Sequence, residues 1–404
     1  MNIWNISIQN IKSKPLYTFL SVFILSLSIA LLLGIQQLKR SFENQIENNL
    51  GNIDIVVGAK GSPLQLVLAS VLHLDNPTGN ISYKEALKIS KNPMIKWAVP
   101  ISYGDNYKGF RIVGTTDTFT ALYNAELEKG HRVQNSMEVV LGNNVAQKLK
   151  LKIGDTFLSS HGLIENSIEV HNEMFTVVGI LKSTQKVIDR LIITNLDSIW
   201  DVHHHEDEDE NNEEHHHDEH HHEKEITSLL INFKNPRGLL TFPRRINEQT
   251  NMQASLPKYE LHKLYEYTSI GFKTISLIAY LILVISCLTI FISLYKMVKE
   301  RAFDLALLRT YGASNFQLIK MVFYEGLIVV FSSFLVGYLL LKIGLGFMLH
   351  FMETSYQQNI LQELPFQEVL QIGFLILIMV IVSVSLAIYP IIKMNISTIL
   401  SNEK

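Results

Sequence analysis

Residues 295–326, YKMVKERAFDLALLRTYGASNFQLIKMVFYEG, form the stretch around which the rest of the chain is organised. They make a short basic connector between two long apolar segments, residues 272–294 and 321–341. The middle of the connector, residues 303–311, has apolar side chains at the spacing of a small amphipathic helix. We therefore expect a rigid helix across the ends of two membrane spans. The alternative is an ordinary loop that joins the spans.

Two signals predict where this helix ends and where the next one begins. Gly312 suits the left-handed conformation that ends many helices, because glycine has no Cβ. Ser314 and Gln317 have the S-x-x-Q spacing of a capping box. Both helix ends in the connector are thus predicted at defined residues.

Four apolar segments are long enough to cross a membrane, which requires about 20 apolar residues. They are residues 16–35, 272–294, 321–341 and 369–392. For the first segment a cleaved signal peptide is the alternative, because Lys12 and Lys14 precede it. No small-x-small cleavage site follows, so we expect an uncleaved anchor.

The basic residues predict the orientation. One side of the membrane receives the Lys and Arg residues that flank the spans: Lys12, Lys14, Lys296, Lys299, Arg301, Arg309, Lys320 and Lys393. Residues 346–367, in the short loop on the other side, contain no Lys or Arg. By the positive-inside rule, both termini are expected in the cytoplasm.

The predicted fold class is a membrane protein with four transmembrane α-helices and an α/β extracytoplasmic domain inserted between spans 1 and 2. Its parts outside the spans are a cytoplasmic interfacial helix (1–15), the extracytoplasmic domain (36–271), the cytoplasmic coupling loop (295–320), a short extracytoplasmic loop (342–368) and a cytoplasmic tail (393–404). The interfacial helix is predicted from apolar side chains at helical spacing, namely Trp4, Ile8 and Ile11.

The inserted domain has alternating strand-like and helix-like segments. Apolar and β-branched runs predict strands at residues 52–57, 108–114, 175–180, 190–194 and 226–233, and helices are predicted at 84–90 and 144–149. Leu38 and Phe42 continue the first span, while Leu261 and Leu264 lead into the second. These positions predict helical stalks at both ends of the domain; two ordinary amphipathic helices are the alternative.

Residues 300–314, ERAFDLALLRTYGAS, resemble the cytoplasmic loop of FtsX/MacB-type ABC permeases, whose pattern is roughly R-x-x-E-I-[AG]-L-L-R-A-x-G-A-S. Arg301 and Arg309 match this pattern, Asp304 replaces the usual Glu, and residues 312–314 match as they stand.

The resemblance extends over nearly the whole chain. Residues 141–149, 153–156 and 175–181 are similar to the family's periplasmic domain. Tyr389 and Pro390 resemble the start of its closing motif, although residues 395–397 lack the usual proline.

The resemblance implies a non-catalytic permease subunit in a bacterial inner membrane, with the large domain outside the cytoplasm. Its implied partners are a separate cytoplasmic ABC ATPase, a second permease copy or paralogue, and a periplasmic protein or lipoprotein; no nucleic acid is expected. Residues that would couple to the ATPase are Glu300, Arg301, Asp304, Arg309, Gly312 and Ser314. Mechanotransmission by a dimer is the implied mechanism.

No catalytic motif occurs in the sequence. Residues 58–61, GAKG, are too short for a phosphate-binding loop and lack the Ser or Thr after Lys. His73, His131 and the other His residues outside the tract described next are scattered singly, so they are expected to be structural or surface residues. Energy for transport must therefore come from another chain.

Residues 203–225, HHHEDEDENNEEHHHDEHHHEKE, form a His-rich acidic loop. Nine of the 15 His residues lie in its three triplets: His203, His204, His205, His215, His216, His217, His220, His221 and His222. Imidazole and carboxylate groups bind Zn²⁺, Cu²⁺ and Ni²⁺, so we expect weak binding of such ions, with no intrinsic cofactor elsewhere. The alternative is a solvated low-complexity spacer.

Charge is distributed unevenly along the chain. Residues 201–225 contain twelve acidic residues and one Lys, so the rest carries 34 basic against 26 acidic residues. The single cysteine, Cys287, lies in an apolar segment and is expected to be a small core residue.

Charged residues within the spans are rare. Glu325 lies near the cytoplasmic end of the third span, where we expect it to pair with a basic residue of the coupling loop. Lys342, at the other end, is expected to extend to the interface. No span carries a series of ionisable groups, which argues against a secondary transporter or an ion channel.

Two functions follow. The first is a mechanotransmission permease linked to zinc or copper handling or to lipoprotein or export work. The second is a metal-responsive membrane receptor on the same scaffold. A gene for an ATPase beside this one would favour the first, and a kinase gene would favour the second.

Overall fold

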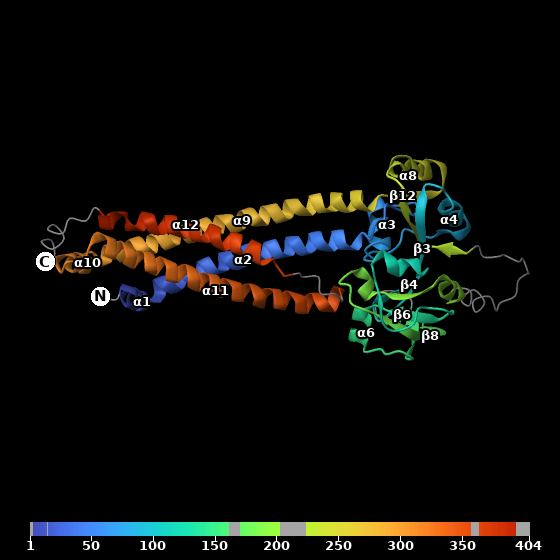
Figure 1. The fold of residues 1–404 in the computed structure, drawn as a ribbon, viewed down its shortest axis with the longest axis horizontal. Helices are drawn as coiled ribbons and strands as arrows, with labels where there is room; N and C mark the ends of the chain where they lie inside the picture. Colours follow the sequence, from blue (N-terminus) through green and yellow to red (C-terminus); the bar gives the residue numbers. More distant parts are fainter. Residues whose placement is uncertain (1–2, 14, 161–169, 203–223, 357–362, 393–404) are drawn as a thin grey trace, which may run out of the picture. The chain divides into compact units, whose positions relative to one another are not determined.

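The computed structural model describes residues 3–13, 15–160, 170–202, 224–356 and 363–392 of the chain. It divides into two compact units (Figure 1). Unit 1 comprises residues 1–42 and 268–404, and unit 2 comprises residues 43–267. The three His triplets of the predicted metal-binding loop lie outside the described residues.

Unit 1 is a bundle of α-helices. Its elements are α1 (Ile3–Ser13), α2 (Pro15–Asn49), α9 (Pro257–Glu300), α10 (Ala302–Thr310), α11 (Asn315–Tyr356) and α12 (Phe366–Ile392), of which α2 and α9 continue into unit 2. Four of the described helices, α2, α9, α11 and α12, are long and apolar enough to cross a membrane, with mean hydropathies of 2.1 to 2.8. The four predicted spans are confirmed at this level.

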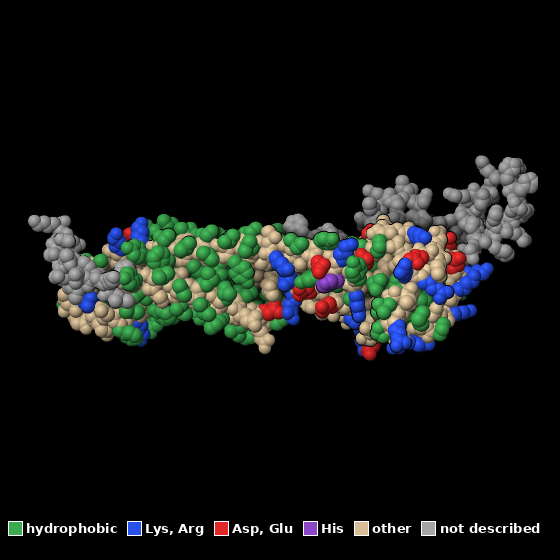
Figure 2. All heavy atoms as spheres, turned by 90° about the horizontal axis from the view of Figure 1, so that it is seen from above, with side chains coloured by type: hydrophobic (Ala, Val, Ile, Leu, Met, Phe, Trp, Pro, Cys, Tyr) green, Lys and Arg blue, Asp and Glu red, His purple; other side chains and the backbone are tan. Residues whose placement is uncertain are grey.

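The bundle core is apolar and closely packed. Leu25, Ile29 and Leu33 of α2 are fully buried against the other helices. A Cβ added to Gly337 of α11 would lie 2.8 Å from the carbonyl oxygen of Ser26, so α11 approaches α2 at a contact that only glycine permits. The face of the bundle seen in Figure 2 is also largely apolar, and each of the long helices has large exposed apolar side chains. This is the surface expected of helices that face lipid rather than water.

A serine pair and a cysteine also lie in the interior of the bundle. The hydroxyl oxygens of Ser28 in α2 and Ser286 in α9 lie 3.2 Å apart and form a hydrogen bond. Next to Ser286, the thiol of Cys287 is free and buried in the same core. The expectation that this cysteine is a core residue is therefore confirmed.

Unit 2 is built on one mixed sheet. Its strands are β1 (Ile55–Ala59), β3 (Ile95–Tyr107), β4 (Phe110–Thr115), β5 (Leu127–Gly130), β6 (Glu138–Leu141), β7 (Thr156–Ser160), β8 (Val170–Leu181), β9 (Ile192–Asn195), β11 (Ser228–Phe233) and β12 (Met252–Ser255). They follow the order β12-β1-β11-β3-β4-β9-β6-β8-β5, and β7 pairs with both β3 and β8. These pairings close six strands, from β3 through β4, β9, β6, β8 and β7, into a ring.

Helices cover the sheet, and one short ribbon adds to it. The helical elements are α3 (Pro63–Ser70), α4 (Tyr83–Ser90), α5 (Thr118–Leu122), α6 (Asn143–Leu149), the 3₁₀ helix η1 (Val187–Arg190), α8 (Arg237–Gln249) and a helical segment at residues 196–202. The ribbon pairs β2 (Ile81–Ser82) with β10 (Glu225–Ile226). The α/β class predicted for this domain is thus confirmed.

Alternation along the strands separates two cores, because successive side chains of a strand point to opposite faces. Val113 of β4 and Ile193 of β9 are buried in one core, which includes Phe119 of α5. Ile112 and Ile192 are buried in the other, which includes Ile199 of the segment 196–202. The two connecting helices therefore lie on opposite faces of the same pair of strands.

The ends of both predicted stalks belong to unit 2. Ile46 near the end of α2 and Leu264 near the start of α9 pack against the core that contains Phe119. The side-chain oxygen of Asn49, the last residue of α2, accepts a hydrogen bond of 2.7 Å from the backbone N–H of Val187. Both stalks are therefore helical, as predicted, and are anchored in this core.

His73 has the structural role expected for a single histidine. Its Nδ1 lies 2.6 Å from the hydroxyl of Tyr103, and its ring is buried. Burial, together with the nearby Arg190 and Arg111 guanidinium groups, holds the pKa of His73 well below its ordinary value. The ring is thus neutral at physiological pH and acts as a packing and hydrogen-bonding group.

The topology can be tested with single cysteines in a Cys287→Ala background. Asn251, in unit 2, and Ser314, in the coupling loop, are both exposed. We expect Asn251→Cys to react with a membrane-impermeant maleimide in intact cells. Ser314→Cys should react only after permeabilisation. Reaction of Ser314→Cys in intact cells would contradict the predicted orientation.

Candidate functional site

The coupling loop contains a helix, α10, within one residue of its predicted bounds. Leu305 is buried in the bundle core, and Ala306 beside it is fully buried, so this side of the helix faces the bundle. Asp304 lies in the first turn and Arg309 in the last. Both charges complement the helix dipole, which favours anions at the N-terminus and cations at the C-terminus.

The helix ends at Gly312, as predicted. Gly312 has a φ of +96°, in the left-handed region where side chains are strained. Its N–H donates to the carbonyl of Arg309 at 3.0 Å, and the N–H of Ala313 donates to the carbonyl of Leu308 at 3.0 Å. These two bonds form a Schellman motif, which satisfies the last carbonyls of the helix.

The next helix, α11, begins with the predicted capping box. The N–H of Ser314 donates to the side-chain oxygen of Gln317 at 2.9 Å. In return, the N–H of Gln317 donates to the hydroxyl of Ser314 at 3.3 Å. With one helix closed and the next one capped within a few residues, the loop has a defined shape rather than that of a flexible connector.

The outer side of this loop is apolar and exposed. Phe303 and Leu307 of α10 are exposed, and Tyr311 and Phe316 are 82% and 72% exposed. Exposed aromatic side chains around a short rigid helix are typical of a protein interface. Asp304 lies on the same exposed side, whereas Leu305 and Ala306 face the bundle.

On its inner side, the loop is linked to a buried carboxylate. Glu325 of α11 is only 1% exposed. Its Oε1 accepts a hydrogen bond of 2.6 Å from the side-chain amide of Asn10 in α1, and it lies 3.9 Å from Arg301 Nη1. Arg301 also donates to the side-chain oxygen of Asn10. The expected pairing of Glu325 with a basic residue of the coupling loop is therefore confirmed.

Asn10, Arg301 and Glu325 form a cluster of three side chains. They belong to α1, to the residue before α10 and to α11, respectively. A second contact supports this cluster, because the hydroxyl of Ser7 donates to the backbone carbonyl of Met321 at 3.1 Å.

The helix α1 thus buries the polar residues Ser7 and Asn10. Trp4, on another side of the helix, is about half exposed and contacts the ring of Tyr324 edge-on. The sequence interpretation, based on the apolar stripe, missed Ser7 and Asn10. Their i, i+3 spacing was the available signal.

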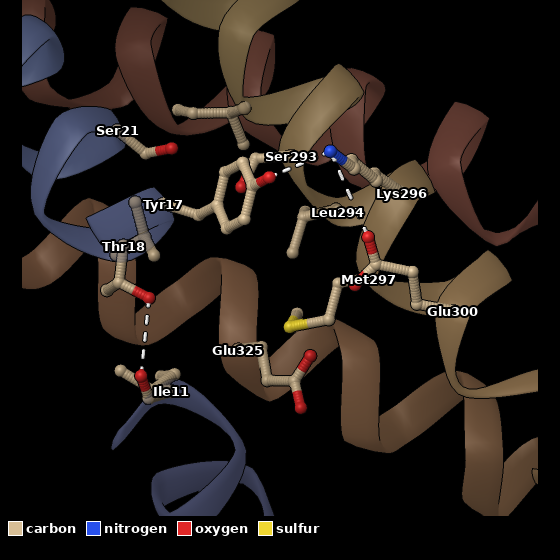
Figure 3. A pocket seen from close by; sticks show the side chains of 12 residues that line it. Ile11, Tyr17, Thr18, Ser21, Ser293, Leu294, Lys296, Met297, Glu300 and Glu325 are labelled. Carbon is tan, nitrogen blue, oxygen red and sulfur yellow. Dashed lines mark hydrogen bonds and ion pairs between the residues drawn. The ribbon is translucent and has the colours of Figure 1, made fainter. Parts of the chain in front are cut away.

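The packing beside Glu325 leaves little space. A cavity of about 20 Å³ is lined by Glu325, Met297, Tyr17 and neighbouring residues (Figure 3). Lys296 donates to the hydroxyl of Tyr17 at 2.7 Å and lies 3.9 Å from Glu300. A volume of this size holds one or two water molecules and no larger ligand.

Comparison with known proteins identifies both units. Residues 18–234 match the family model described as the MacB-like periplasmic core domain, and residues 276–397 match the FtsX-like permease C-terminal model. The chain belongs to the FtsX/MacB-type ABC transporter permeases. No curated protein matches the permease by sequence.

Two of the solved structures similar to the permease are a periplasmic region and an extracellular domain of other transporters. One is the periplasmic region of MacB from Actinobacillus actinomycetemcomitans, with 10% identity and a TM-score of 0.35; the match covers 54% of the permease and 97% of that chain. Another is the extracellular domain of the noncanonic ABC-type transporter YknZ from Gram-positive bacteria, with 11% identity and a TM-score of 0.32, covering 50% and 98%.

The predicted coupling residues of the permease occupy different environments. Glu300 ends α9 and lies near Lys296, whereas Asp304, Gly312 and Ser314 are exposed at the loop. Arg301, by contrast, is directed inward to Asn10 and Glu325. The exposed coupling residues are thus distinct from Arg301, which holds the loop in place.

The two other predicted features can be located only in part. Lys342 lies 2.6 Å from the carboxylate of Glu363, whose side chain is 83% exposed. This exposure is expected for an ion pair at the membrane interface. Among the described residues, no group of three or more His, Cys, Asp or Glu could hold a metal ion. The nine predicted histidine ligands lie outside the described residues.

We expect Asn10→Leu to destabilise the permease, because the buried Glu325 and Arg301 would each lose a hydrogen-bonding partner. The loss should be about 1–3 kcal/mol, the cost of leaving a buried polar group unsatisfied. Thermal unfolding of the detergent-solubilised permease measures it. Gln9→Leu, at an exposed position of the same helix, is the matched control. Equal melting temperatures for the two variants would contradict the importance of this cluster.

Proposed function

We propose that the permease is a mechanotransmission subunit, which transfers the ATP-driven movement of a separate cytoplasmic ATPase to unit 2. The observation that carries this proposal is the rigid, exposed apolar surface of the coupling loop. Phe303, Leu307, Tyr311 and Phe316 supply contact area for a partner. The Schellman motif and the capping box allow the loop to move as one piece when a partner pushes it.

Movement of the loop would reach the spans directly. Leu305 is packed in the bundle core, and Ala306 beside it is fully buried. Arg301 is linked to α1 and α11 through Asn10 and Glu325. A buried, hydrogen-bonded charge is costly to separate from its partners, so these elements should shift together. The N-terminal helix is therefore part of the moving assembly in this proposal.

The link to unit 2 would be provided by α2 and α9. Each helix runs without a break from unit 1 to unit 2, over Pro15–Asn49 and Pro257–Glu300. Within unit 2, the end of α2 is held by the bond from Val187 to Asn49. A helix that is continuous and anchored at its end can transmit a displacement along its axis.

Charge within the bundle supports this mechanism over transport of a charged solute through the spans. Glu325 is the one Asp, Glu, Lys or Arg side chain that is buried in the described part of unit 1, and it is already paired. A proton relay or ion path would need several such groups in series. We therefore propose that the work is done on a molecule outside the cytoplasm, such as a lipoprotein or an export substrate.

The complete assembly in this proposal contains two permease chains and two ATPase subunits in a bacterial inner membrane. The second permease chain is another copy or a paralogue. The family models support the permease subunit itself, and its partners follow from the exposed coupling loop. ATP hydrolysis is assigned to the partner chain, since the permease sequence has no phosphate-binding loop.

Two substitutions test the coupling role. Arg309→Glu reverses a charge in the last turn of α10, and Gly312→Pro replaces a residue with φ of +96° by one restricted to about −65°. Each should lower the stimulation of the partner ATPase by about tenfold, equivalent to about 1.4 kcal/mol of coupling. The measurement is ATP hydrolysis by the reconstituted complex.

Membrane insertion of each variant and its co-purification with the ATPase distinguish uncoupling from misfolding. An uncoupled variant still inserts and still binds the ATPase. Lys88→Glu, at an exposed position of α4 in unit 2, is the matched charge reversal and should leave stimulation unchanged. If both loop variants stimulate the ATPase like the unaltered permease, the loop is only a connector and the proposed mechanism is wrong.

We also propose that the His-rich loop binds Zn²⁺, or Cu²⁺ or Ni²⁺, through the nine histidines of its triplets. Its described flanks are well anchored. Val202 is buried, and Lys224 lies 3.3 Å from Asp197 and 4.1 Å from the ring of Trp200. The tract can therefore be removed as residues 203–223 without disturbing either flank. Val202 belongs to a core, so a deletion that includes it would damage the unit.

Deletion of residues 203–223, replaced by a short Gly-Ser linker, should abolish binding of more than one Zn²⁺ per chain at neutral pH. In the full-length permease, binding should weaken as the pH falls toward about 5, because protons compete for imidazoles with an ordinary pKa of about 6.5. Calorimetric titration with zinc chloride measures both effects. Equal zinc binding by the two proteins would leave the tract as a solvated spacer.

A further inference from the structure

Unit 2 contains a crevice that the coupling mechanism does not use. It has a volume of about 530 Å³ and lies at the ends of β4 and β9, where Thr115 and Asn195 are both in its lining. Pockets that hold small molecules usually have volumes of about 300–1,000 Å³. The crevice is therefore large enough for a ligand of several residues or rings.

The topology explains why the crevice is there. Strands β4 and β9 are neighbours and run parallel, with Ile112 opposite Ile192 and Thr115 opposite Asn195. After β4 the chain enters α5, on the face of Phe119. After β9 it enters the segment 196–202, on the face of Ile199.

Because the two connections leave toward opposite faces, they open a gap beyond the carboxyl ends of the strands. In α/β sheets this is the place where ligands characteristically bind. Strand β6 runs antiparallel to β9, so the segment before β6, which contains Arg132, reaches the same edge. The ends of β4 and β9 and the segment before β6 therefore meet at this edge.

Three of the threonine hydroxyl groups that line the crevice form hydrogen bonds with the protein itself. Thr115 donates to the carbonyl of Pro100 at 2.8 Å, and Thr120 donates to the carbonyl of Asp117 at 3.0 Å. Thr194 donates to the carbonyl of Glu138 at 2.8 Å. These residues shape the crevice, while its charged side chains are left to decide what it binds.

Four charged side chains line the crevice: Asp117, Arg132, Asp197 and Lys224. Asp197 and Lys224 pair with each other at 3.3 Å, and Lys224 also covers the ring of Trp200. Asp117 stands at the N-cap of α5, where an aspartate usually caps the helix, yet its side chain makes no capping bond. Arg132 is exposed and forms no ion pair with a described residue.

One wall of the crevice is held in place by aromatic packing. The ring of Tyr83 lies 5.0 Å from that of Trp200, whose indole N–H donates to the carbonyl of Glu225 at 2.7 Å. This wall is preformed, and Lys224 and Asp197 are already paired with each other. The two remaining charged side chains, the anionic Asp117 and the cationic Arg132, are available to a ligand. The lining as a whole is balanced in charge, which disfavours ligands with a large net charge.

We propose that this crevice binds a small zwitterion with a free ammonium and a free carboxylate group, an amino acid or a short peptide. Asp117 receives the ammonium and Arg132 the carboxylate, to which a guanidinium can donate two hydrogen bonds. The proposal concerns unit 2 alone. It does not depend on the coupling loop, so either proposal can fail without the other.

The test is calorimetric titration of the full-length detergent-solubilised permease with trialanine, N-acetyl-trialanine, trialanine amide and alanine. We expect trialanine to bind at least about tenfold more tightly than either of the two blocked forms. Asp117→Asn should abolish the preference for trialanine over the N-acetyl form. Arg132→Gln should abolish the preference over the amide. Alanine decides the length: if it binds as tightly as trialanine, the ligand is an amino acid rather than a peptide.

Glu85→Gln and Lys88→Gln are matched controls, because these exposed charges of α4 lie outside the crevice lining. Both should retain the full preference for trialanine. The proposal is overturned if trialanine and alanine do not bind, if the blocked forms bind as tightly, or if both crevice variants keep the preferences of the unaltered permease. Unchanged thermal unfolding of the variants shows that any loss is local, since Asp117 and Arg132 are exposed.

Discussion

The buried carboxylate of Glu325 is the constraint on which the end of the bundle that carries the coupling loop depends. An ionised group in an apolar interior is tolerated only with a partner and hydrogen bonds. Asn10 and Arg301 provide them, from α1 and from the residue before α10. One requirement of electrostatics thereby holds the N-terminal helix, the coupling loop and the third span together. The loop can present an exposed apolar surface because its inner side is fixed in this way.

Unit 2 satisfies a different constraint, that of covering both faces of a mixed sheet. Two parallel pairs, β4 with β9 and β6 with β8, occur in a sheet that is otherwise antiparallel. Parallel neighbours need crossover connections, and here those connections put helices on both faces. The same arrangement that buries Phe119 and Ile199 opens the crevice at the strand ends. Packing and a ligand-sized cavity thus have one structural origin.

Local chemistry explains why much of the site was predictable. The Schellman motif at Gly312 and the capping box of Ser314 and Gln317 depend on residues a few positions apart, so their bonds follow from spacing alone. The pairing of Glu325 was predictable in kind, because an intramembrane carboxylate needs a partner. The hydrogen bond between Glu325 and Asn10 was not predictable. The two residues are 315 positions apart, and an asparagine has no charge that would indicate a partner.

The sequence by itself determined the number of spans, the insertion between the first two and the shape of the coupling loop. Each is set by hydropathy over about 20 residues or by contacts within one turn of helix. Only the tertiary structure decided which way Arg301 points, which face of α1 is buried and where the crevice forms. Those features depend on the order of β4, β9 and β6 in the sheet and on helix packing. Periodicity states which side of an element is apolar, but it does not state which neighbour that side will meet.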